Sequence, residues 1–306
     1  MKKAGALRRD LHLNGSLYLM VLPVVAFYIL FHYLPMSGVI IAFKNYKPAK
    51  GVFGSAWAGM GGFQHFHDFF TNFYFYRTLR NTLLINLYTL LFGFPAPIVF
   101  ALLLNEVKCR PFKRAVQTVS YFPHFISLVV VCGMLTEFCL SDGLFNQIRA
   151  LFGLSPKPLL QDPLLFRTIY VSSGVWQTVG WSSIVYLAAI AGIDQGLYEA
   201  AALDGAGRWR CMWHITLPGL KQTVVVLLIM QIGKMMNVSA DKIILLYNNS
   251  TMETADVISS YVYRRGLLEL SWSFSTAVGL FNSVINCALV VGANAMSRRL
   301  TESSLF

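Results

Sequence analysis

The chain has 306 residues, of which 56% are hydrophobic and 13% are charged, and its mean hydropathy is +0.55. An ordinary soluble domain has about a quarter of its residues charged, so the excess of apolar surface requires lipid. The net charge of +11 is spread in short basic clusters between apolar segments, which argues against a nucleic-acid-binding face and is typical of membrane topology.

Apolar segments recur along the chain and predict an all-α, polytopic membrane protein. A helix needs about 20 apolar residues to cross a bilayer, and six segments reach this length. The first follows Lys2, Lys3, Arg8 and Arg9, but it is too long for a signal peptide and lacks a small-residue cleavage site, so we expect it to be retained. The six predicted spans are Leu17 to Phe43, Thr82 to Leu104, Val116 to Leu140, Ile169 to Ile193, Leu220 to Ala240 and Thr276 to Met296.

The predicted orientation places both termini in the cytoplasm. Six spans put the termini on one side, and Lys and Arg are densest in the segments that this orientation places inside. We therefore expect a cytoplasmic N-terminus over 1–16, a first transmembrane helix over 17–43, a five-helix transmembrane domain over 78–296 and a cytoplasmic tail over 297–306.

Five prolines lie within the predicted spans. Each removes a backbone donor and tends to bend its helix, as expected of a protein that moves. Packing of bent helices is an equally good interpretation, because prolines are common in membrane helices of every function. These residues are Pro23, Pro35, Pro95, Pro97 and Pro123.

The most informative segment lies between the fourth and fifth spans, over residues 194–218. Asp194 can cap a short helix, and the alanines that follow favour helix and leave a flat surface that another protein can approach closely. Gly205 and Gly207 permit a sharp turn into a second helix that ends near Pro218. We predict a cytoplasmic helix–turn–helix; the alternative is an interfacial amphipathic loop without special purpose.

This segment resembles the EAA motif of type I ABC importer permeases, with Glu199-Ala200-Ala201, Asp204-Gly205-Ala206, Ile215 and Leu217-Pro218 at the family spacing. In that family the first helix docks in a cleft of the ATPase subunit and carries its motion into the membrane. The resemblance implies a polar contact from Glu199, close approach at Ala200 and Ala201, and a turn at Gly205. Gly207 departs from the family, which more often has a polar residue there, and implies a looser turn.

The resemblance covers nearly the whole chain and is to carbohydrate permeases related to polysaccharide and oligo-uronide importers. It implies an ATP-driven oligosaccharide importer in the bacterial cytoplasmic membrane, in which this chain pairs with a second homologous permease, an ATPase dimer and an extracytoplasmic sugar-binding lipoprotein. The chain has no Gly-x-x-x-x-Gly-Lys-Ser/Thr phosphate loop, so we expect a transport subunit that is not an enzyme and holds no cofactor, with ATP and Mg²⁺ bound by the ATPase. The matching stretches include Arg80 to Leu83, Gly93 to Pro97, Gln117 to His124, Leu187 to Asp194 and Thr254 to Val257.

The fifth span carries the first part of a predicted substrate path. Helical spacing puts Gln231, Lys234 and Asp241 on one face. A charge at the membrane centre costs about 2.5–3.5 kcal/mol on insertion scales, so we expect Lys234 to face a wet cavity together with Gln231 and Asn237. The resembling permeases usually have a neutral residue at position 234, and a lysine in the cavity would favour an anionic sugar such as an oligo-uronide. The alternative is a structural Lys234–Asp241 pair or a contact with the second permease.

The fourth span carries the second part of this path. Trp176, Gln177 and Trp181 combine aromatic faces with hydrogen-bonding groups, which suit the apolar face and hydroxyls of a sugar. The alternative is an interfacial aromatic belt, which occurs whatever the substrate.

Other classes of function leave weaker signals. His65, His67 and Asp68 lie together without a matching distant pair, so we expect no metal site. A polytopic membrane enzyme would need a catalytic cluster at membrane depth, and the sequence shows none. The remaining alternative is a secondary carrier or channel for small polar solutes, which would transport without an ATPase.

Overall fold

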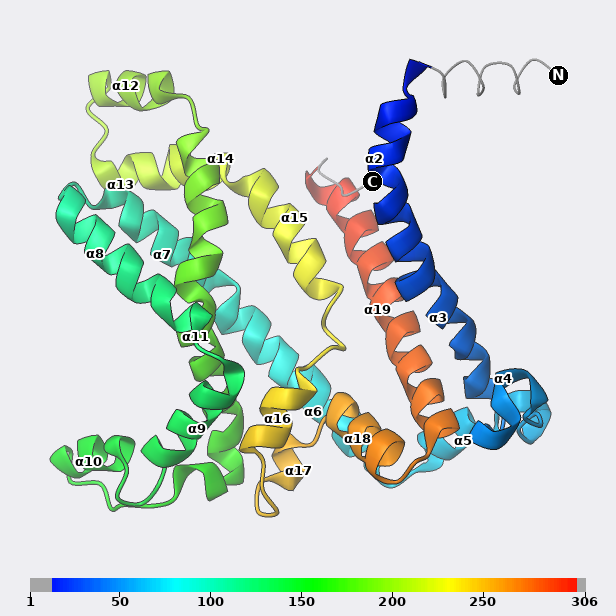
Figure 1. Cartoon of the computed structure of the whole chain (residues 1–306). Coiled ribbons are helices and arrows are strands. Elements are labelled where there is room, and N and C mark those ends of the chain that lie inside the picture. Colours follow the sequence, from blue (N-terminus) through cyan, green and yellow to red (C-terminus); the bar gives the residue numbers. More distant parts are fainter. Residues whose placement is uncertain (1–12, 302–306) are drawn as a thin grey trace. The chain divides into compact units, whose positions relative to one another are not determined.

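The computed structural model describes residues 13–301, whose regular structure is helical apart from one isolated bridge between Lys44 and Trp57 (Figure 1). These residues form two compact units. One holds the described chain up to Phe70 together with Arg265–Leu280, and the other holds Thr71–Arg264 together with the chain from Phe281 onward. The all-α membrane class predicted from the sequence is confirmed.

Part of the predicted topology lies outside the described residues. This applies to the basic residues Lys2, Lys3, Arg8 and Arg9, to most of the expected N-terminal segment 1–16, and to the last residues of the expected tail 297–306.

The first unit is dominated by a continuous helix of 29 residues, Gly15–Phe43. No side chain from Gly15 to Met36 is buried within the chain. Exposure of so much apolar surface to water is unfavourable, so this helix requires lipid or a partner around it. Its parts and the helices that follow are α2 (Gly15–Tyr28), a π-helical turn (Ile29–Tyr33), α3 (Leu34–Met36), a 3-10 turn (Ser37–Phe43), α4 (Gly51–Gly54) and α5 (Gln64–Thr71).

The second unit holds most of the remaining helices, and α19 (Trp272–Thr301) runs from the first unit into it. In chain order these helices are α6 (Tyr74–Tyr88), α7 (Pro95–Glu106), α8 (Arg110–Tyr121), α9 (Leu128–Phe138), α10 (Leu144–Leu151), α11 (Pro163–Ala191), α12 (Gln195–Leu203), α13 (Arg208–Cys211), α14 (Leu217–Gly219), α15 (Lys221–Ile232), α16 (Ala240–Leu246), α17 (Met252–Ala255) and α18 (Ile258–Tyr263).

Three helices in residues 13–301 are long and apolar enough to cross a membrane: Gly15–Phe43, Tyr74–Glu106 and Trp272–Arg299. Two bent pairs raise this to five if each is one span, with bends of 100° between Arg110–Phe125 and Leu128–Phe138, and 56° between Arg208–Gly219 and Lys221–Ile232. The fourth predicted span corresponds to α11, which has 29 residues but is less apolar because it carries serines, threonines and Gln177. The count of six spans therefore stays a prediction.

Two predicted spans are not single straight helices. The third breaks at a 3-10 turn over Phe122–Phe125 that contains Pro123, and Ser127 then caps α9 by accepting a hydrogen bond from the Val130 N–H. The fifth stops at Ile232, and α16 begins at Ala240. At Gly233 a Cβ would lie 2.2 Å from the Val290 side chain of α19, so the chain turns where it packs closely on that helix.

Three prolines are accommodated by π-helical turns. Pro35, Pro95 and Pro218 each stand two residues after such a turn, over Ile29–Tyr33, Thr89–Gly93 and Met212–Thr216. A proline ring clashes with the carbonyl of the residue four positions earlier, and in each case that carbonyl lies within the wider π turn. The helix therefore continues through the proline.

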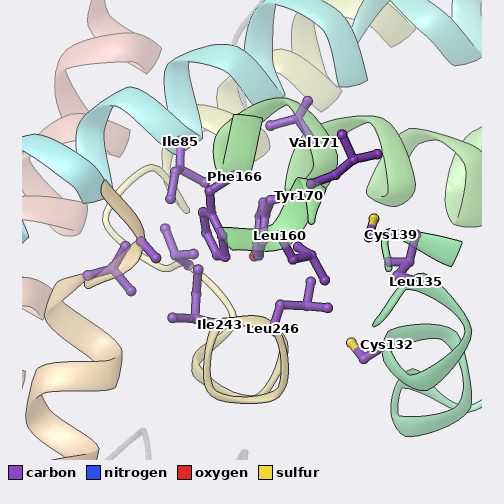
Figure 2. Close-up of a cluster of buried hydrophobic side chains, with 14 of the residues drawn as sticks. Ile85, Cys132, Leu135, Cys139, Leu160, Phe166, Tyr170, Val171, Ile243 and Leu246 are labelled. Atoms are coloured by element: carbon purple, nitrogen blue, oxygen red, sulfur yellow. The ribbon is translucent and has the colours of Figure 1, made fainter. Parts of the chain in front are cut away.

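The core of the second unit joins α6, α9, α11 and α16 (Figure 2). Phe166 and Ile243 are fully buried in it, and Tyr170 lies beside them. Cys132 and Cys139 belong to the same cluster as free thiols, in keeping with the behaviour of cysteine as a small hydrophobe. This core fixes α16 against α11 although the two are far apart in sequence.

Helices α8 and α11 meet at their backbones. A Cβ on Gly180 would lie 2.2 Å from the carbonyl oxygen of Ser120. No larger residue fits at position 180 without separating the helices, so the two elements are held at a fixed distance.

Candidate functional site

The segment over residues 194–218 forms the predicted helix–turn–helix. The Asp194 side chain caps α12 by accepting a hydrogen bond of 2.9 Å from the Gly196 N–H. Gly205 has φ +74°, a left-handed conformation that a glycine adopts without steric cost. The chain then enters α13 and continues through a π-helical turn to Pro218. Local sequence signals therefore predicted the shape of this segment correctly.

Within the described chain, few polar contacts hold the helix–turn–helix in place. The Tyr198 hydroxyl and the Thr216 hydroxyl are 2.9 Å apart, which links α12 to the second helix of the segment. Arg208 forms an ion pair with Glu106 at the end of α7, with 2.8 Å between Nε and Oε2. Inside the turn the Ala206 N–H donates to the Ala201 carbonyl at 2.8 Å.

The outer face of this segment is apolar and exposed. Leu203 is 90% exposed, Trp209 68% and Trp213 61%. Monomeric soluble surfaces seldom gather large apolar side chains in this way, and such patches mark interaction sites. Of the predicted coupling residues, Glu199, Ala200, Asp204, Gly205, Gly207 and Pro218 are exposed, while Ala201, Ala206, Ile215 and Leu217 are half-buried.

A cavity of about 700 Å³ lies in the second unit, with walls from α6, α7, α11, α15 and α16. Five of the six predicted path residues line it: Gln177, Trp181, Gln231, Lys234 and Asn237. The sixth, Trp176, is 47% exposed and is not among the lining residues.

The aromatic wall of the cavity is positioned by neighbours from the bend after α8. The Trp181 ring stacks on the His124 ring with a centroid distance of 4.6 Å and an interplanar angle of 4°, and the Phe125 ring meets it edge-on. The Gln177 amide donates to the Ile126 carbonyl at 3.3 Å. These contacts fix the orientation of both side chains on α11.

The stretch between α15 and α16 is tied to α19 by amide groups. Asn237 Oδ1 accepts hydrogen bonds from the Asn282 and Asn286 side chains at 2.9 and 3.1 Å, and the Met236 N–H donates to Asn286 at 3.0 Å. Asn237 thus has a structural role as well as a place in the lining.

The prediction that Asp241 shares one helical face with Gln231 was wrong. Since α15 ends at Ile232, Asp241 lies on a different helix from Gln231. The alternative, an ion pair between Lys234 and Asp241, is not formed either: among the described residues no carboxylate oxygen lies within 4.0 Å of the Lys234 ammonium.

Sequence reasoning missed a second lysine in the cavity. Lys242 is 5% exposed, and its Nζ donates to the Tyr170 carbonyl at 2.9 Å and lies 4.6 Å from the centroid of the Tyr170 ring. The available signal was a lysine within a short apolar run, just beyond the end of the fifth predicted span at Ala240.

A buried polar cluster around Asp256 was also missed. Asp256 is fully buried, and its carboxylate accepts hydrogen bonds from Arg264 at 2.6 and 2.9 Å, from the Ser260 hydroxyl at 2.7 Å and from Arg77 at 3.4 Å. Burial by itself lowers the pKa of Arg264, but the hydrogen bonds and charge of Asp256 raise that pKa above its usual value. The carboxylate therefore stabilises the charged guanidinium.

Asn81 connects this cluster to two further helices. Its amide donates to the carbonyls of Glu253 and Asp256 at 2.8 and 2.9 Å, and its oxygen accepts from Arg167 of α11 at 2.8 Å. Two of the stretches that carried the family resemblance, Arg80 to Leu83 and Thr254 to Val257, are thus in direct contact.

The described residues contain no group of three or more His, Cys, Asp or Glu that could hold a metal ion. In the histidine-rich stretch, His65 Nε2 lies 3.2 Å from the Lys44 carbonyl, and His67 faces Asp68 at 3.7 Å. Both histidines thus have neighbours within the protein.

Comparisons with known proteins agree across almost the whole chain. The family model described as "Binding-protein-dependent transport system inner membrane component" matches residues 70–302. Protein LplB of Bacillus subtilis is 43% identical over 303 residues, which cover 99% of this chain and 93% of that protein. The polygalacturonan/rhamnogalacturonan transport system permease protein YteP of the same organism is 43% identical over 291 residues, covering 95% and 90%.

A solved structure extends this similarity to three dimensions. One chain in the crystal structure of a bacterial ABC transporter involved in the import of the acidic polysaccharide alginate superposes with a TM-score of 0.89 and 43% identity, covering 97% of this chain and 99% of that one. A second structure of a bacterial alginate ABC transporter, in complex with alginate pentasaccharide-bound periplasmic protein, gives a TM-score of 0.89 and 42% identity.

Proposed function

We propose that this chain, which belongs to the family of inner membrane components of binding-protein-dependent transport systems, moves oligosaccharides through the membrane as one permease subunit of an ATP-driven importer. It is a multi-pass transport subunit and not an enzyme. The proposed substrate class is supported by YteP, a polygalacturonan/rhamnogalacturonan permease, and by the alginate transporter, whose sequences match nearly the full chain at 43% identity.

The main support for this proposal is that a single helix connects the cavity to the exposed segment over residues 194–218. Helix α11 contributes Gln177 and Trp181 to the cavity wall and ends at Ala191, three residues before the Asp194 cap of α12. A force applied to α12 therefore reaches the cavity through one continuous element.

We assign the coupling role to the helix–turn–helix. Glu199 supplies a polar contact to the ATPase, Ala200 and Ala201 allow its close approach, and Gly205 forms the turn. The segment also contains Asp204, Ala206, Gly207, Ile215, Leu217 and Pro218. The assignment is supported by the exposure of Glu199 and Ala200 and by the apolar side chain of Leu203, which has no cover within the described chain.

We assign the substrate path to the cavity. Trp181 offers its ring to the apolar face of a sugar, and Gln177, Gln231 and Asn237 offer amides to its hydroxyls. The volume of about 700 Å³ falls within the range of about 300–1,000 Å³ that is usual for small-molecule sites. Trp176 is left out of the path because it does not line the cavity.

The partners in this proposal are a second homologous permease, an ATPase dimer and an extracytoplasmic sugar-binding lipoprotein. ATP and Mg²⁺ are bound by the ATPase. Six spans place both termini in the cytoplasm, and residues 194–218 face the ATPase on the same side. The similarity to a transporter solved with its periplasmic protein supports the binding-protein partner.

The first experiment is purification of the tagged chain in detergent, identification of its partners by mass spectrometry, and measurement of sugar uptake and ATP hydrolysis by the complex in proteoliposomes. We expect a second permease and an ATPase to co-purify, and uptake to require ATP. Transport by the lone chain without nucleotide would replace the importer with a secondary carrier or channel.

Glu199→Lys tests the coupling assignment within that complex. Glu199 is exposed, so the permease variant should fold normally. Loss of a hydrogen bond to a charged group lowers affinity by about tenfold or more, and we expect uptake per ATP hydrolysed to fall accordingly. Lys221→Met serves as a control because this exposed residue lies outside 194–218, and it should couple as the wild type does.

A further inference from the structure

The charge of the cavity is uniform in sign. Two ammonium groups, those of Lys234 and Lys242, belong to its lining, and none of the 25 residues that the described structure places there is Asp or Glu. Neither lysine has a carboxylate within 4.0 Å in the described chain. A cavity with this lining favours an anion.

Lys242 is the more informative of the two lysines. It is 5% exposed, and burying an ammonium group without an opposite charge is costly. An ammonium has three N–H donors, but the described chain offers Lys242 Nζ one acceptor, the Tyr170 carbonyl. The remaining donors are free to bind something within the cavity.

The surrounding structure keeps this ammonium in place. Helix α16 is anchored in the core by Ile243 and Leu246, beside Tyr170 (Figure 2). Gly174, one turn after Tyr170, has no side chain, and a Cβ there would lie 3.4 Å from Lys242 Nζ. A Cβ at that distance would make an ordinary van der Waals contact, so Lys242 Nζ lies close to the backbone of α11, where its bond to the Tyr170 carbonyl holds it at the cavity wall.

We propose that Lys242, together with Lys234, forms a carboxylate-binding site that makes the path selective for acidic oligosaccharides built of uronic acid units. This inference rests on the proposed function and names the substrate class and the residues that select it. A uronate carboxylate accepts hydrogen bonds from the unused donors of Lys242 and supplies the missing opposite charge. Lys234, which is exposed, meets a carboxylate at lower desolvation cost.

The competing explanation is purely structural: Lys242 would only connect α16 to α11 through the Tyr170 carbonyl. The two explanations differ in their response to substrate charge. A structural connection affects every substrate alike, whereas a carboxylate site affects acidic substrates alone.

The test uses the full complex in proteoliposomes with two matched probes, a short galacturonate oligomer and the same oligomer with all carboxylates methyl-esterified. The ester keeps the size and ring pattern but carries no charge. Uptake of both is measured for wild type, Lys242→Met and Lys234→Met. Lys221→Met removes an exposed lysine outside the cavity lining and is the control. Thermal unfolding of each complex reports on folding.

We expect Lys242→Met to lower uptake of the acid relative to the ester by about tenfold, the scale of a hydrogen bond to a charged group, with Lys234→Met acting in the same direction and Lys221→Met unchanged. Equal loss of both probes, or no loss, in a complex that unfolds at the wild-type temperature would overturn the site. A wild-type complex that takes up neutral oligosaccharides with ATP but neither probe would overturn this inference alone, whereas one that takes up no oligosaccharide with ATP would refute the proposed function.

Discussion

The second unit contains two regions that are built on opposite principles, the buried polar cluster around Asp256 and the exposed segment over residues 194–218. They lie at opposite ends of the unit (Figure 1). Asp256 is fully buried, and its carboxylate is bonded by Arg264, Arg77 and Ser260. The other segment exposes 90% of Leu203 and is tied to the protein by a few contacts.

This contrast separates what the chain stabilises by itself from what it leaves to a partner. The Asp256 cluster joins α6, α11 and the segment around α17 without outside help, through Asn81 and Arg167. Residues 194–218 have a defined shape but an uncovered apolar face. Substitutions in the cluster should therefore affect folding, and substitutions on the exposed face should affect association.

The largest effect should follow from Asp256→Asn. The substitution leaves two partly buried guanidinium groups without their carboxylate, and breaking a buried pair in this way costs about 3–5 kcal/mol. We expect poor yield of the complex and a lower unfolding temperature. Glu269→Gln is the matched control, because the Arg265–Glu269 pair is an exposed i,i+4 pair of the kind that contributes about 0.3–0.5 kcal/mol. If Asp256→Asn unfolds at the wild-type temperature, the Asp256 cluster does not anchor the fold.

A smaller effect, of a different kind, should follow from Leu203→Ser. Full burial of a leucine side chain contributes about 1.5–3 kcal/mol, so we expect the ATPase to bind the permease roughly tenfold more weakly or worse, with unchanged unfolding temperature. Leu164→Ser is the control, since Leu164 is 85% exposed at the start of α11. Binding of the ATPase to immobilised permease measures both. Equal affinity in the two variants would show that Leu203 is not part of the interface.

The smallest effect should follow from Tyr198→Phe. It removes the hydrogen bond to Thr216, and a bond of this kind contributes about 0.5–1.5 kcal/mol. Assembly should persist while uptake per ATP falls a few-fold, because α12 is then less firmly tied to the helix that follows. Thr216→Val deletes the other partner of the bond and should reproduce the defect. A complex that couples normally in both variants would mean that the bond does not transmit force.

The two regions also differ in how far sequence predicts them. The shape of 194–218 follows from local signals, a capping aspartate and a glycine at the turn, and Asp194 and Gly205 behave as expected. The Asp256 cluster depends on pairs such as Arg77 and Asp256, which are 179 positions apart. No local pattern encodes such a contact.

The cavity falls between these two cases. Polar and aromatic side chains within apolar spans identified Gln177, Trp181, Gln231, Lys234 and Asn237, all of which line it, and Trp176, which does not. The assumption of one regular helix from 220 to 240 gave the wrong neighbour, Asp241, because α15 stops at Ile232. Lys242 was missed because its contact with Tyr170 spans 72 positions.

The π-helical turns before Pro35, Pro95 and Pro218 determine how the helix after each turn is rotated about its own axis. Successive residues of an α-helix are rotated by about 100°, and a π turn inserts one residue into that progression. Deletion of one residue within Thr89–Gly93 would rotate α7 by about this angle, turning Pro97 away from the cavity and Ala101 away from its packing against Tyr186 and Leu220. The number of residues in that turn thus determines which face of α7 meets the transported molecule.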